Sequence, residues 1–202
     1  MTVGDTNPRR GLRALTRDSV RDQIADQALR LFDADGFDET TVDDIAGAVG
    51  ISARSFFRYF PAKEDVVISD SRPLGILVRD SAAARPAAEP VWTVLRRAFE
   101  PLEVATGDEV DRGLRIMRVM MSTATLRARN LEKHITWGVL LEPVVVERLD
   151  GDPDTRRFRA QTLIHAALAC LDVALAEWTR REGAVPVSQL LDEAFAAVGR
   201  CN

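Results

Sequence analysis

A glycine between two short helical patterns constrains this chain more than any other feature. Gly50 follows a segment whose apolar residues recur at helical spacing and share one face of a helix. These residues are Val42, Ile45, Ala46 and Val49. Glycine readily adopts the left-handed conformation that ends a helix, and Ser52 then caps a second helix, Ala53 to Phe60, which stops at Pro61. The pattern predicts a helix-turn-helix, whose second helix can enter the major groove of DNA.

The start of the first helix is also marked in the sequence. Thr41 precedes the apolar pattern and Asp44 follows three residues later. This spacing is typical of a capping box, in which each side chain bonds a free backbone N–H of the first turn. Carboxylates in that turn also complement the helix dipole. We therefore expect the helix to begin directly after Thr41.

Local charge favours a nucleic-acid-binding role for the second helix. From Ile51 to Lys63 the charged residues are Arg54, Arg58 and Lys63, with no acid among them, whereas acidic residues lie on both sides. A cationic, acid-free helix is what a polyanion selects. The alternative is an ordinary helical hairpin whose arginines are only solvated. Both interpretations fit the pattern of helices and turn by itself.

Helical geometry divides the roles within the second helix. Phe56 and Phe60 are four residues apart and should point into a core. The N-terminal residues of a recognition helix meet base edges. Arg54 is the expected base reader, since its guanidinium can pair bidentately with guanine, which is worth about 1–3 kcal/mol of discrimination. The residues expected beside it on the bases are Ala53, Ser55 and Phe57.

The run FDETTVDDIAGAVGISARSFFRYFPAKEDVV resembles the DNA-binding domain of the tetracycline-repressor (TetR) family of transcriptional regulators. The match covers about Thr16 to Val67. The resemblance implies an all-helical homodimer that represses genes until a small ligand binds its C-terminal domain. It also implies phosphate contacts, which carry affinity without sequence information, from Thr41, Tyr59 and Lys63 together with Arg58. One departure is Ala62, where family members often carry a polar cap, so the next helix starts on Pro61 alone.

Bulk properties restrict the chain further. It has 202 residues, 46% of them hydrophobic, and a net charge of −4, so DNA binding must come from a local patch. The two cysteines, Cys170 and Cys201, are too few for a disulfide framework or a zinc site. We expect no uninterrupted apolar run of the ~18 residues that a membrane span needs, and no signal peptide. These features predict a cytoplasmic protein without a cofactor.

The chain is predicted to be all-α and to divide into three parts. Residues 1–15 read as a flexible arm, 16–62 as the helix-turn-helix domain, and 63–202 as a ligand-binding and dimerisation domain. Arg9, Arg10 and Arg13 make the arm basic, so it either reaches along DNA or is basic by chance. A bent connector is expected near Ser71. The helices expected are 17–34, 42–49, 53–60, 91–104, 108–122, 123–149 with an interruption at Gly138 or Pro143, 154–181 and 187–198.

The last two helices, about 154–181 and 187–198, are predicted to form the homodimer contact. Apolar and small residues mark one face of each helix, and two such helices can pair with their symmetry mates. On the longer helix these are Leu163, Ala167, Leu171, Ala174 and Trp178; on the shorter they are Leu190, Leu191, Ala194, Phe195 and Val198. The alternative is that both faces pack inside the monomer. Two helix-turn-helix domains can occupy half-sites one DNA turn apart only if the protein is a dimer.

The middle helices supply candidates for a pocket that binds a small apolar or amphipathic effector. Methionines adapt to irregular shapes, which suits an apolar cavity between helices. The candidate ligand-binding residues are Met117, Met120, Met121, Trp137, Leu141 and His165. The run RGLRIMRVMMSTATLRARNLEKHITW is similar to a family branch, often encoded in actinobacteria, with members that sense fatty acyl-CoA. That similarity implies that Arg127 or Arg129 meets phosphates, and the alternative for both is a solvated surface.

Catalysis is not expected. The chain has two histidines and none of the common hydrolase, metalloprotease or phosphate-loop motifs. Asp43 and Asp44 are explained by the start of a helix. We therefore predict a ligand-responsive transcriptional regulator, a repressor that binds a palindromic operator as a dimer. The alternative is a helical ligand-binding or interaction module without DNA affinity. Operator, regulated genes and effector identity are not encoded in any recognisable motif.

Overall fold

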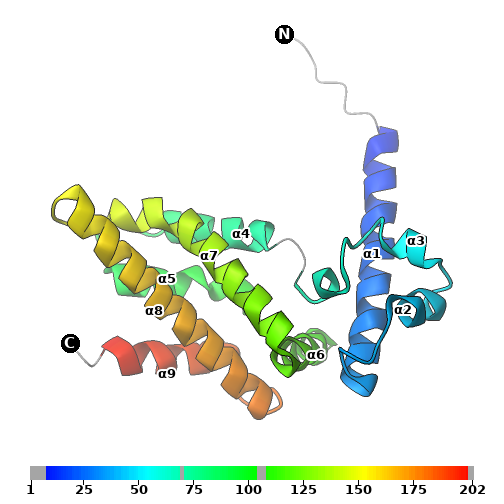
Figure 1. The fold of residues 1–202 in the computed structure, drawn as a ribbon. Helices are drawn as coiled ribbons and strands as arrows, with labels where there is room; N and C mark the ends of the chain where they lie inside the picture. Colours follow the sequence, from blue (N-terminus) through cyan, green and yellow to red (C-terminus); the bar gives the residue numbers. More distant parts are fainter. Residues whose placement is uncertain (1–7, 69–70, 104–107, 200–202) are drawn as a thin grey trace, which may run out of the picture. The chain divides into compact units, whose positions relative to one another are not determined.

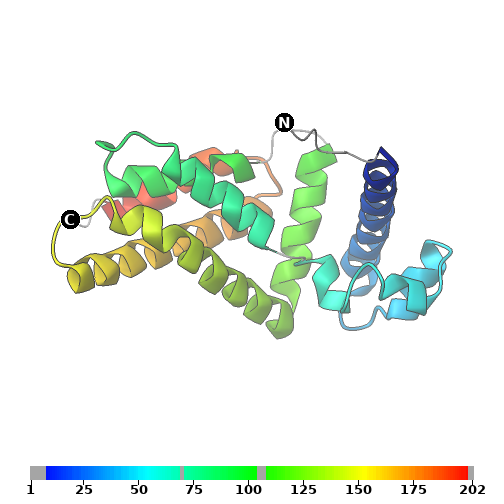
Figure 2. The same cartoon turned by 90° about the horizontal axis from the view of Figure 1, so that it is seen from above.

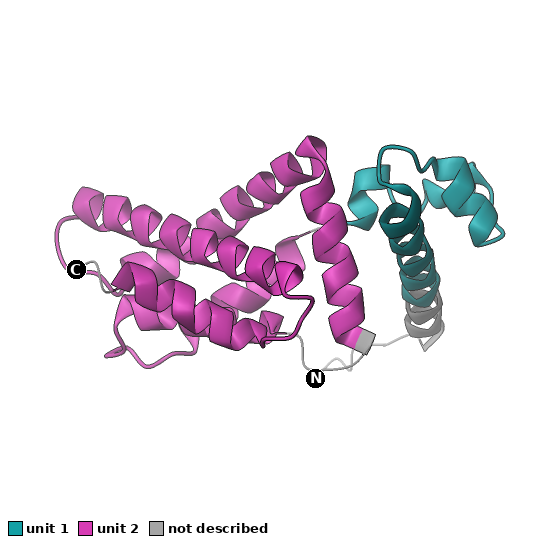
Figure 3. Cartoon of the chain, turned by 90° about the horizontal axis from the view of Figure 1, so that it is seen from below, with its two compact units in different colours: residues 1–69 teal, residues 70–202 magenta. Residues whose placement is uncertain are grey.

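A computed structural model describes residues 8–68, 71–103 and 108–199, with side chains from Arg17 onward and excluding that of Asp108. Within these ranges the chain forms helices and turns and no strand, so the all-α prediction is confirmed. It divides into two compact units, residues 1–69 and 70–202 (Figure 3). The division lies after residue 69, whereas the sequence predicts that the helix-turn-helix domain, which we call the head, ends at Ala62. The three-part domain assignment itself stays a prediction.

Unit 1 contains α1 (Pro8–Asp35), α2 (Val42–Ala48), α3 (Ala53–Phe56) and the short 3-10 helix η1 (Lys63–Val66) (Figure 1). Its α1 begins at Pro8 and not at the predicted Arg17. Proline suits the first position of a helix because its missing N–H has no partner there in any case. The predicted flexible arm is therefore helical from Pro8 on, and its first seven residues, 1–7, lie outside the described part.

A small apolar core holds the head together. The rings of Phe32 and Phe37 pack at a tilt with centroids 4.9 Å apart, and those of Phe56 and Phe60 with centroids 5.6 Å apart. The remaining buried apolar side chains of the head come from α1, α2 and η1: Ile24, Ala25, Ala28, Leu29, Ile45, Ala46 and Val66, followed by Val67. The inward position predicted for Phe56 and Phe60 is confirmed.

Unit 2 is a bundle of longer helices (Figure 2). Its elements are α4 (Arg72–Ala83), α5 (Val91–Ala98), the 3-10 helix η2 (Glu100–Leu102), α6 (Asp108–Ser122), α7 (Ala124–Val146), α8 (Pro153–Arg180) and α9 (Val187–Gly199). Helix α7 packs against α4, α6 and α8, and α9 packs against α8 and α5. Most predicted boundaries agree with these elements to within a few residues.

The predicted interruption of α7 at Gly138 or Pro143 is wrong. The helix continues through both residues to Val146. Proline within a helix removes one hydrogen bond, here the bond to the carbonyl of Val139 four residues earlier. The missing hydrogen bond lies in the last turn of α7. Val139 is exposed there, so water can donate a hydrogen bond to its carbonyl.

Helix α8 is, among the described helices, the one long and apolar enough to pass for a membrane span by length and composition. No uninterrupted apolar run marks this helix in the sequence, because charged and polar residues are scattered along it. One such helix is weak evidence for a membrane, since core helices of globular proteins pass the same test. Its buried residues, which include Ile164, Leu168 and Leu171, pack inside unit 2.

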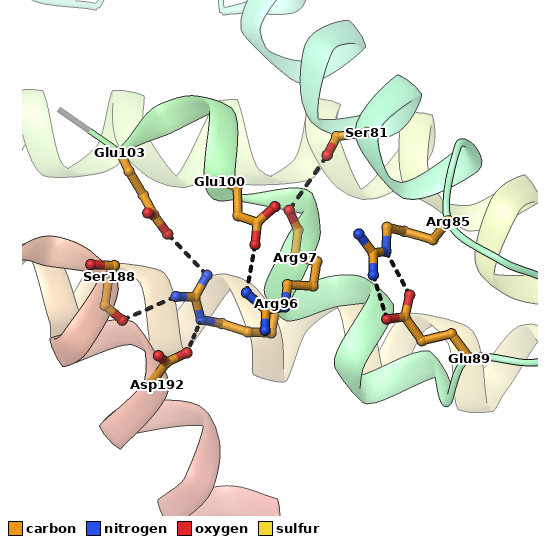
Figure 4. A network of polar contacts seen from close by, with 9 residues as sticks. All are labelled: Ser81, Arg85, Glu89, Arg96, Arg97, Glu100, Glu103, Ser188 and Asp192. Carbon is orange, nitrogen blue, oxygen red and sulfur yellow. Dashed lines mark hydrogen bonds and ion pairs between the residues drawn. The ribbon is translucent and has the colours of Figure 1, made fainter. Parts of the chain in front are cut away.

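A buried arginine ties α5 to α9 (Figure 4). The Arg96 guanidinium forms ion pairs with Asp192 Oδ1 at 2.6 Å and with Glu103 Oε1 at 3.0 Å, and it donates to the carbonyl of Ser188 at 3.0 Å. Each of its three nitrogen atoms therefore has an acceptor, as a buried charge requires. The neighbouring Arg97 is exposed and pairs with Glu100.

Candidate nucleic-acid interface

The start of α2 is closed by the predicted capping box. Thr41 Oγ1 accepts a hydrogen bond from Asp44 N at 3.2 Å, and Asp44 Oδ2 accepts from Thr41 N at 2.8 Å. The Thr41 hydroxyl also donates to Asp44 Oδ2 at 2.6 Å. These hydrogen bonds, first from the Thr41 side chain and then from its backbone, hold the pKa of Asp44 below its usual range.

This cap bears on the phosphate contact predicted for Thr41. Both of its hydrogen-bond donors, the backbone N–H and the hydroxyl, are already directed at the Asp44 carboxylate. A phosphate, which accepts hydrogen bonds, would have to compete with that carboxylate. The structure thus gives Thr41 a capping role, and its contact with DNA stays a prediction.

The turn between α2 and α3 forms as the glycine and serine predict. Gly50 has a φ of +70°, in the left-handed region that glycine adopts without steric cost. Ile51 N donates to Ala46 O at 2.9 Å across the turn. Ser52 Oγ then accepts from Ser55 N at 3.2 Å and caps α3. Local hydrogen bonds therefore fix where the second helix begins.

The α-helical part of α3 is shorter than predicted, because it ends at Phe56 and not at Phe60. Beyond it, Arg58 N donates to Ser55 O at 3.2 Å and Tyr59 N donates to Phe56 O at 2.8 Å. Such three-residue spacing tightens the chain into a 3-10-like turn. Phe60 N still reaches Phe56 O at 3.0 Å, so the segment stays coiled up to Pro61.

Buried and exposed side chains alternate along this segment. Phe56 and Phe60 are buried, whereas Arg54, Phe57 and Arg58 face solvent, and Phe57 is 52% exposed. Within the described residues, neither the Arg54 nor the Arg58 guanidinium takes part in a hydrogen bond or ion pair; Arg58 only lies over the Tyr59 ring, 5.9 Å from its centroid. Ala53, Ser55 and Tyr59 are partly exposed beside them. Two unpaired cations and an exposed aromatic ring thus share one surface.

Lys63 has an additional role that the sequence did not reveal. Its Nζ donates to the carbonyls of Phe37 at 2.6 Å and Thr40 at 2.9 Å, and it lies 4.3 Å from the centroid of the Phe37 ring. These contacts tie η1 to the loop between α1 and α2. The phosphate contact predicted for Lys63 stays a prediction, since two carbonyls already engage its ammonium group.

The predicted ligand-binding residues lie on three helices, α6, α7 and α8, and a pocket shared by them stays a prediction. Trp137 and Leu141 are buried on α7, and Trp137 Nε1 donates to Ser71 O at 2.8 Å where α4 begins. Met117 and Met120 are buried on α6, whereas Met121 is exposed. His165 lies on the solvent side of α8 and lines a shallow hollow between α7 and α8.

A polar cluster between α7 and α8 was missed. Asn130 Nδ2 donates to Asp172 Oδ1 at 3.1 Å, and the buried His134 places Nε2 3.4 Å from the same oxygen without a hydrogen bond. Burial lowers the pKa of His134, with Lys133 acting in the same direction and Asp172 opposing it. Burial also lowers the pKa of Lys133, whose Nζ lies 5.0 Å from the Trp137 centroid. The spacing of Asn130 and His134, four apart on one helix face, was the available signal.

The residues predicted for the dimer contact are mostly inside unit 2. Ala167, Leu171, Ala174 and Trp178 of α8 are buried in the single chain, as are Leu190, Leu191 and Phe195 of α9. These seven side chains pack between α8, α9 and neighbouring helices of the same chain. Leu163 and Ala194 are only partly buried and Val198 is 46% exposed, so a homodimer contact through these two helices stays a prediction.

A capped helix-turn-helix with a cationic outer surface, followed by a helical bundle, defines a helix-turn-helix regulator with a separate regulatory unit. Comparison with known proteins agrees. Residues 24–69 match the family described as bacterial regulatory proteins, tetR family, and residues 89–201 match the MftR C-terminal domain. The chain belongs to the TetR family of transcriptional regulators.

Individual relatives support this assignment. The mycofactocin biosynthesis transcriptional regulator MftR of Mycobacterium tuberculosis is 30% identical over 188 residues, which cover 91% of each chain. The transcriptional regulator TcmR of Streptomyces glaucescens is 31% identical over 85% of this chain and 78% of its own. Among solved structures, FadR of Thermus thermophilus in complex with lauroyl-CoA has a TM-score of 0.54 at 23% identity, covering 87% of this chain and 91% of that one. This last likeness concerns the fold.

Proposed function

We propose that the protein is a ligand-responsive repressor that binds a palindromic operator as a homodimer. The observation that carries this proposal is the outer surface of α3 and the turn after it, where Arg54, Phe57 and Arg58 are exposed on a segment fixed by local caps. A rigid cationic surface with an exposed aromatic ring suits a DNA groove and has no evident use in a free monomer.

Within this surface, Arg54 reads a base edge, since it follows the Ser52 cap at the N-terminal end of α3. Ser55 and Phe57 contact neighbouring bases, with Phe57 against a thymine methyl, and Ala53 allows close approach. Arg58 and Tyr59 bind phosphates. Thr41 and Lys63 support the head through their cap and carbonyl contacts and lie at its phosphate-facing edge. The relatives are regulators, and we assign this chain no catalytic activity and a cytoplasmic location.

The effector we propose is an amphipathic small molecule with a long apolar part. Support comes from the apolar side chains that α6 and α7 bury within unit 2, which are Met117, Met120, Trp137 and Leu141. Two structures of similar fold, the FadR proteins of Thermus thermophilus and Bacillus subtilis, hold lauroyl-CoA and stearoyl-CoA. Acyl-CoA is therefore the first class to test. An effector can release DNA only through a difference in affinity between the two conformations.

Selection of bound sequences from random double-stranded DNA tests this function. We expect enrichment of an inverted repeat and an affinity that falls steeply with salt, since phosphate contacts release counterions. The selection is repeated with lauroyl-CoA, with free CoA and with laurate as controls, and release by lauroyl-CoA alone supports the proposed effector class. No enrichment and no salt-dependent binding would favour the alternative, a helical module without DNA affinity.

A further inference from the structure

One turn of α7 holds three polar groups that the fold largely removes from water without pairing them. Among the described residues, Asn130 Oδ1 and His134 Nε2 are buried side-chain atoms without a hydrogen-bond partner. Within the same part of the chain, the Lys133 ammonium makes no hydrogen bond and no ion pair, and it lies over the Trp137 ring with Nζ 5.0 Å from the centroid. A buried polar group without a partner costs free energy, so this turn has unused capacity to bind a ligand.

These groups belong to the inner face of α7. Positions 130, 133, 134 and 137 follow each other at spacings of three and four residues, so they share one face of the helix. His134 and Trp137 on that face are buried, and Asn130 and Lys133 are partly exposed at its edge. Ile135, on the outer side of the same turn, is 63% exposed. The polar groups therefore lie inside and an apolar residue outside, the reverse of an ordinary surface helix.

Asp172 of α8 is the acid beside this turn. Its Oδ1 accepts a hydrogen bond from Asn130 Nδ2 at 3.1 Å and lies 3.4 Å from His134 Nε2. Burial lowers the pKa of Lys133, and the charge of Asp172 opposes this effect only in part. Asp172 forms no ion pair with Lys133 among the described residues, and its own side chain is 37% exposed and hydrated. The donors of the Lys133 ammonium therefore stay available.

The unused hydrogen-bonding capacity defines the group that a ligand must present. A lysine ammonium offers three N–H donors and no acceptor, so its partner is an oxygen atom. A phosphate dianion would bring two further negative charges to a buried site that already contains Asp172, which is costly. A carbonyl oxygen accepts a strong, charge-assisted hydrogen bond without that cost. Helix α6 packs against α7, and its buried Met117 and Met120 can rearrange around an apolar chain.

We propose that Lys133 and His134 form a subsite for the carbonyl oxygen of an acyl group whose apolar chain lies between α6 and α7. The proposal rests on the ligand-responsive regulator of the proposed function and names the residues that select its effector. The ammonium exchanges the Trp137 ring for the ligand oxygen. Because Asn130 is three residues away on the same face, the moved ammonium can also donate to its Oδ1. A fatty acid and its CoA thioester both carry this oxygen.

Titration calorimetry of the full-length chain without DNA tests the subsite. The ligands are lauroyl-CoA and S-dodecyl-CoA, a thioether of the same chain length that lacks the carbonyl oxygen. The wild type should bind lauroyl-CoA about tenfold more tightly or better, and Lys133→Met, which keeps the apolar stem but no donor, should bind both compounds alike. Equal affinities in the wild type would overturn the proposal without any variant. A parallel titration with laurate shows whether the free acid or only the thioester supplies the oxygen.

Two controls separate this role from others. Arg129→Met removes a cation four residues earlier on α7, whose side chain is 43% exposed, and should leave the preference for lauroyl-CoA intact. If Lys133→Met weakens both CoA compounds equally and the preference persists, Lys133 binds phosphate and the proposal is wrong.

Thermal unfolding of the free chain provides a second readout. Lys133→Met should melt at the same temperature as the wild type or higher, because an unpaired, largely buried charge is removed. A lower melting temperature with an unchanged ligand preference would give Lys133 a structural role instead. None of these measurements involves DNA, so a failed subsite leaves the operator selection, and with it the proposed function, unaffected.

Discussion

Gly75 of α4 lies against the indole of Trp137 of α7 so closely that a Cβ on residue 75 would come within 2.6 Å of Trp137 Cδ1. The same indole donates through Nε1 to the carbonyl of Ser71, at 2.8 Å. One aromatic side chain therefore fixes both the crossing of the two helices and the point at which α4 begins. Ser71 follows the division between the two units, so this contact anchors the first helix of the second unit.

Gly75→Ala should lower the free energy of unfolding by about 1–3 kcal/mol, because the added methyl group has to displace the indole or separate the helices. Denaturant unfolding followed by circular dichroism measures the change. Gly138→Ala on α7 is the control, since a Cβ there meets His165 and Ile164 only at 3.9 Å. That variant should be neutral or more stable by up to about 1 kcal/mol, and equal losses in both would contradict the close contact.

Phe56 and Phe57 are adjacent in the chain, but Phe56 is buried and Phe57 is exposed, so their alanine variants form a matched pair. Phe56→Ala should destabilise the head by about 3–5 kcal/mol because it empties a fully buried position. Phe57→Ala should leave the head folded and weaken operator binding. Hydrogen exchange of α1 and α2 amides separates the two outcomes. A head that unfolds in both variants would show that the Phe57 ring is part of the core.

Arg54→Ala should relax base preference at one operator position by about 1–3 kcal/mol. Arg58→Ala should instead weaken binding to all sequences alike and reduce the slope of log affinity against log salt by about one. Titration of an operator and its single-base variants at several salt concentrations distinguishes them. Interchanged behaviour would mean that α3 enters the groove in another orientation.

Arg96→Met should lower the free energy of unfolding by about 1–3 kcal/mol, because the partly buried Ser188 carbonyl and Glu103 lose a charged donor. The loss stays below that of a sealed ion pair since the Asp192 side chain is 63% exposed and can be hydrated. Arg97→Met removes an exposed guanidinium one residue away (Figure 4) and should change stability by less than about 0.5 kcal/mol. Thermal unfolding of the two variants provides the comparison.

Acidification should destabilise the second unit through His134. Its pKa in the folded protein lies below the ordinary value near 6.5, chiefly because the side chain is buried. The unfolded chain therefore binds the proton first, and the stability that His134 contributes is present above that ordinary value and lost as pH falls below it. Melting temperature should drop more between pH 7.5 and 5.5 in the wild type than in His134→Gln. The charge of His165 also acts to lower the pKa of His134, so His165→Gln should reduce the wild-type difference only in part.

The parts of the fold that sequence predicts well are those determined by nearest neighbours along the chain. Thr41, Asp44, Gly50 and Ser52 act on backbone groups within a few residues, so their spacing predicts the helix-turn-helix and its caps. Lys63 is different, because its carbonyl partners belong to Phe37 and Thr40, more than twenty residues earlier. No local pattern identifies that contact.

Helix faces in the second unit show the same limit. Periodicity correctly placed α8 and α9, yet α8 is apolar on two sides and periodicity cannot tell which side meets its own chain. Leu171 and Trp178 were predicted to meet a partner and are buried inside, whereas Phe158 and Val173 were overlooked and are exposed. The predicted pocket depends on the same kind of information, because Trp137 is buried and His165 is exposed, a distinction that only packing decides; the pocket itself stays a prediction.

The alternation along residues 53–60 also has an evolutionary consequence. Phe56 and Phe60, which hold the head together, are buried, whereas Arg54 is exposed. The caps at Thr41 and Ser52 lie outside the positions that we propose to face bases. Substitutions at Arg54, Ser55 or Phe57 can therefore change which operator is preferred at little cost in folding. After gene duplication, a copy of such a head can acquire a new target through a few surface replacements while its scaffold is inherited intact.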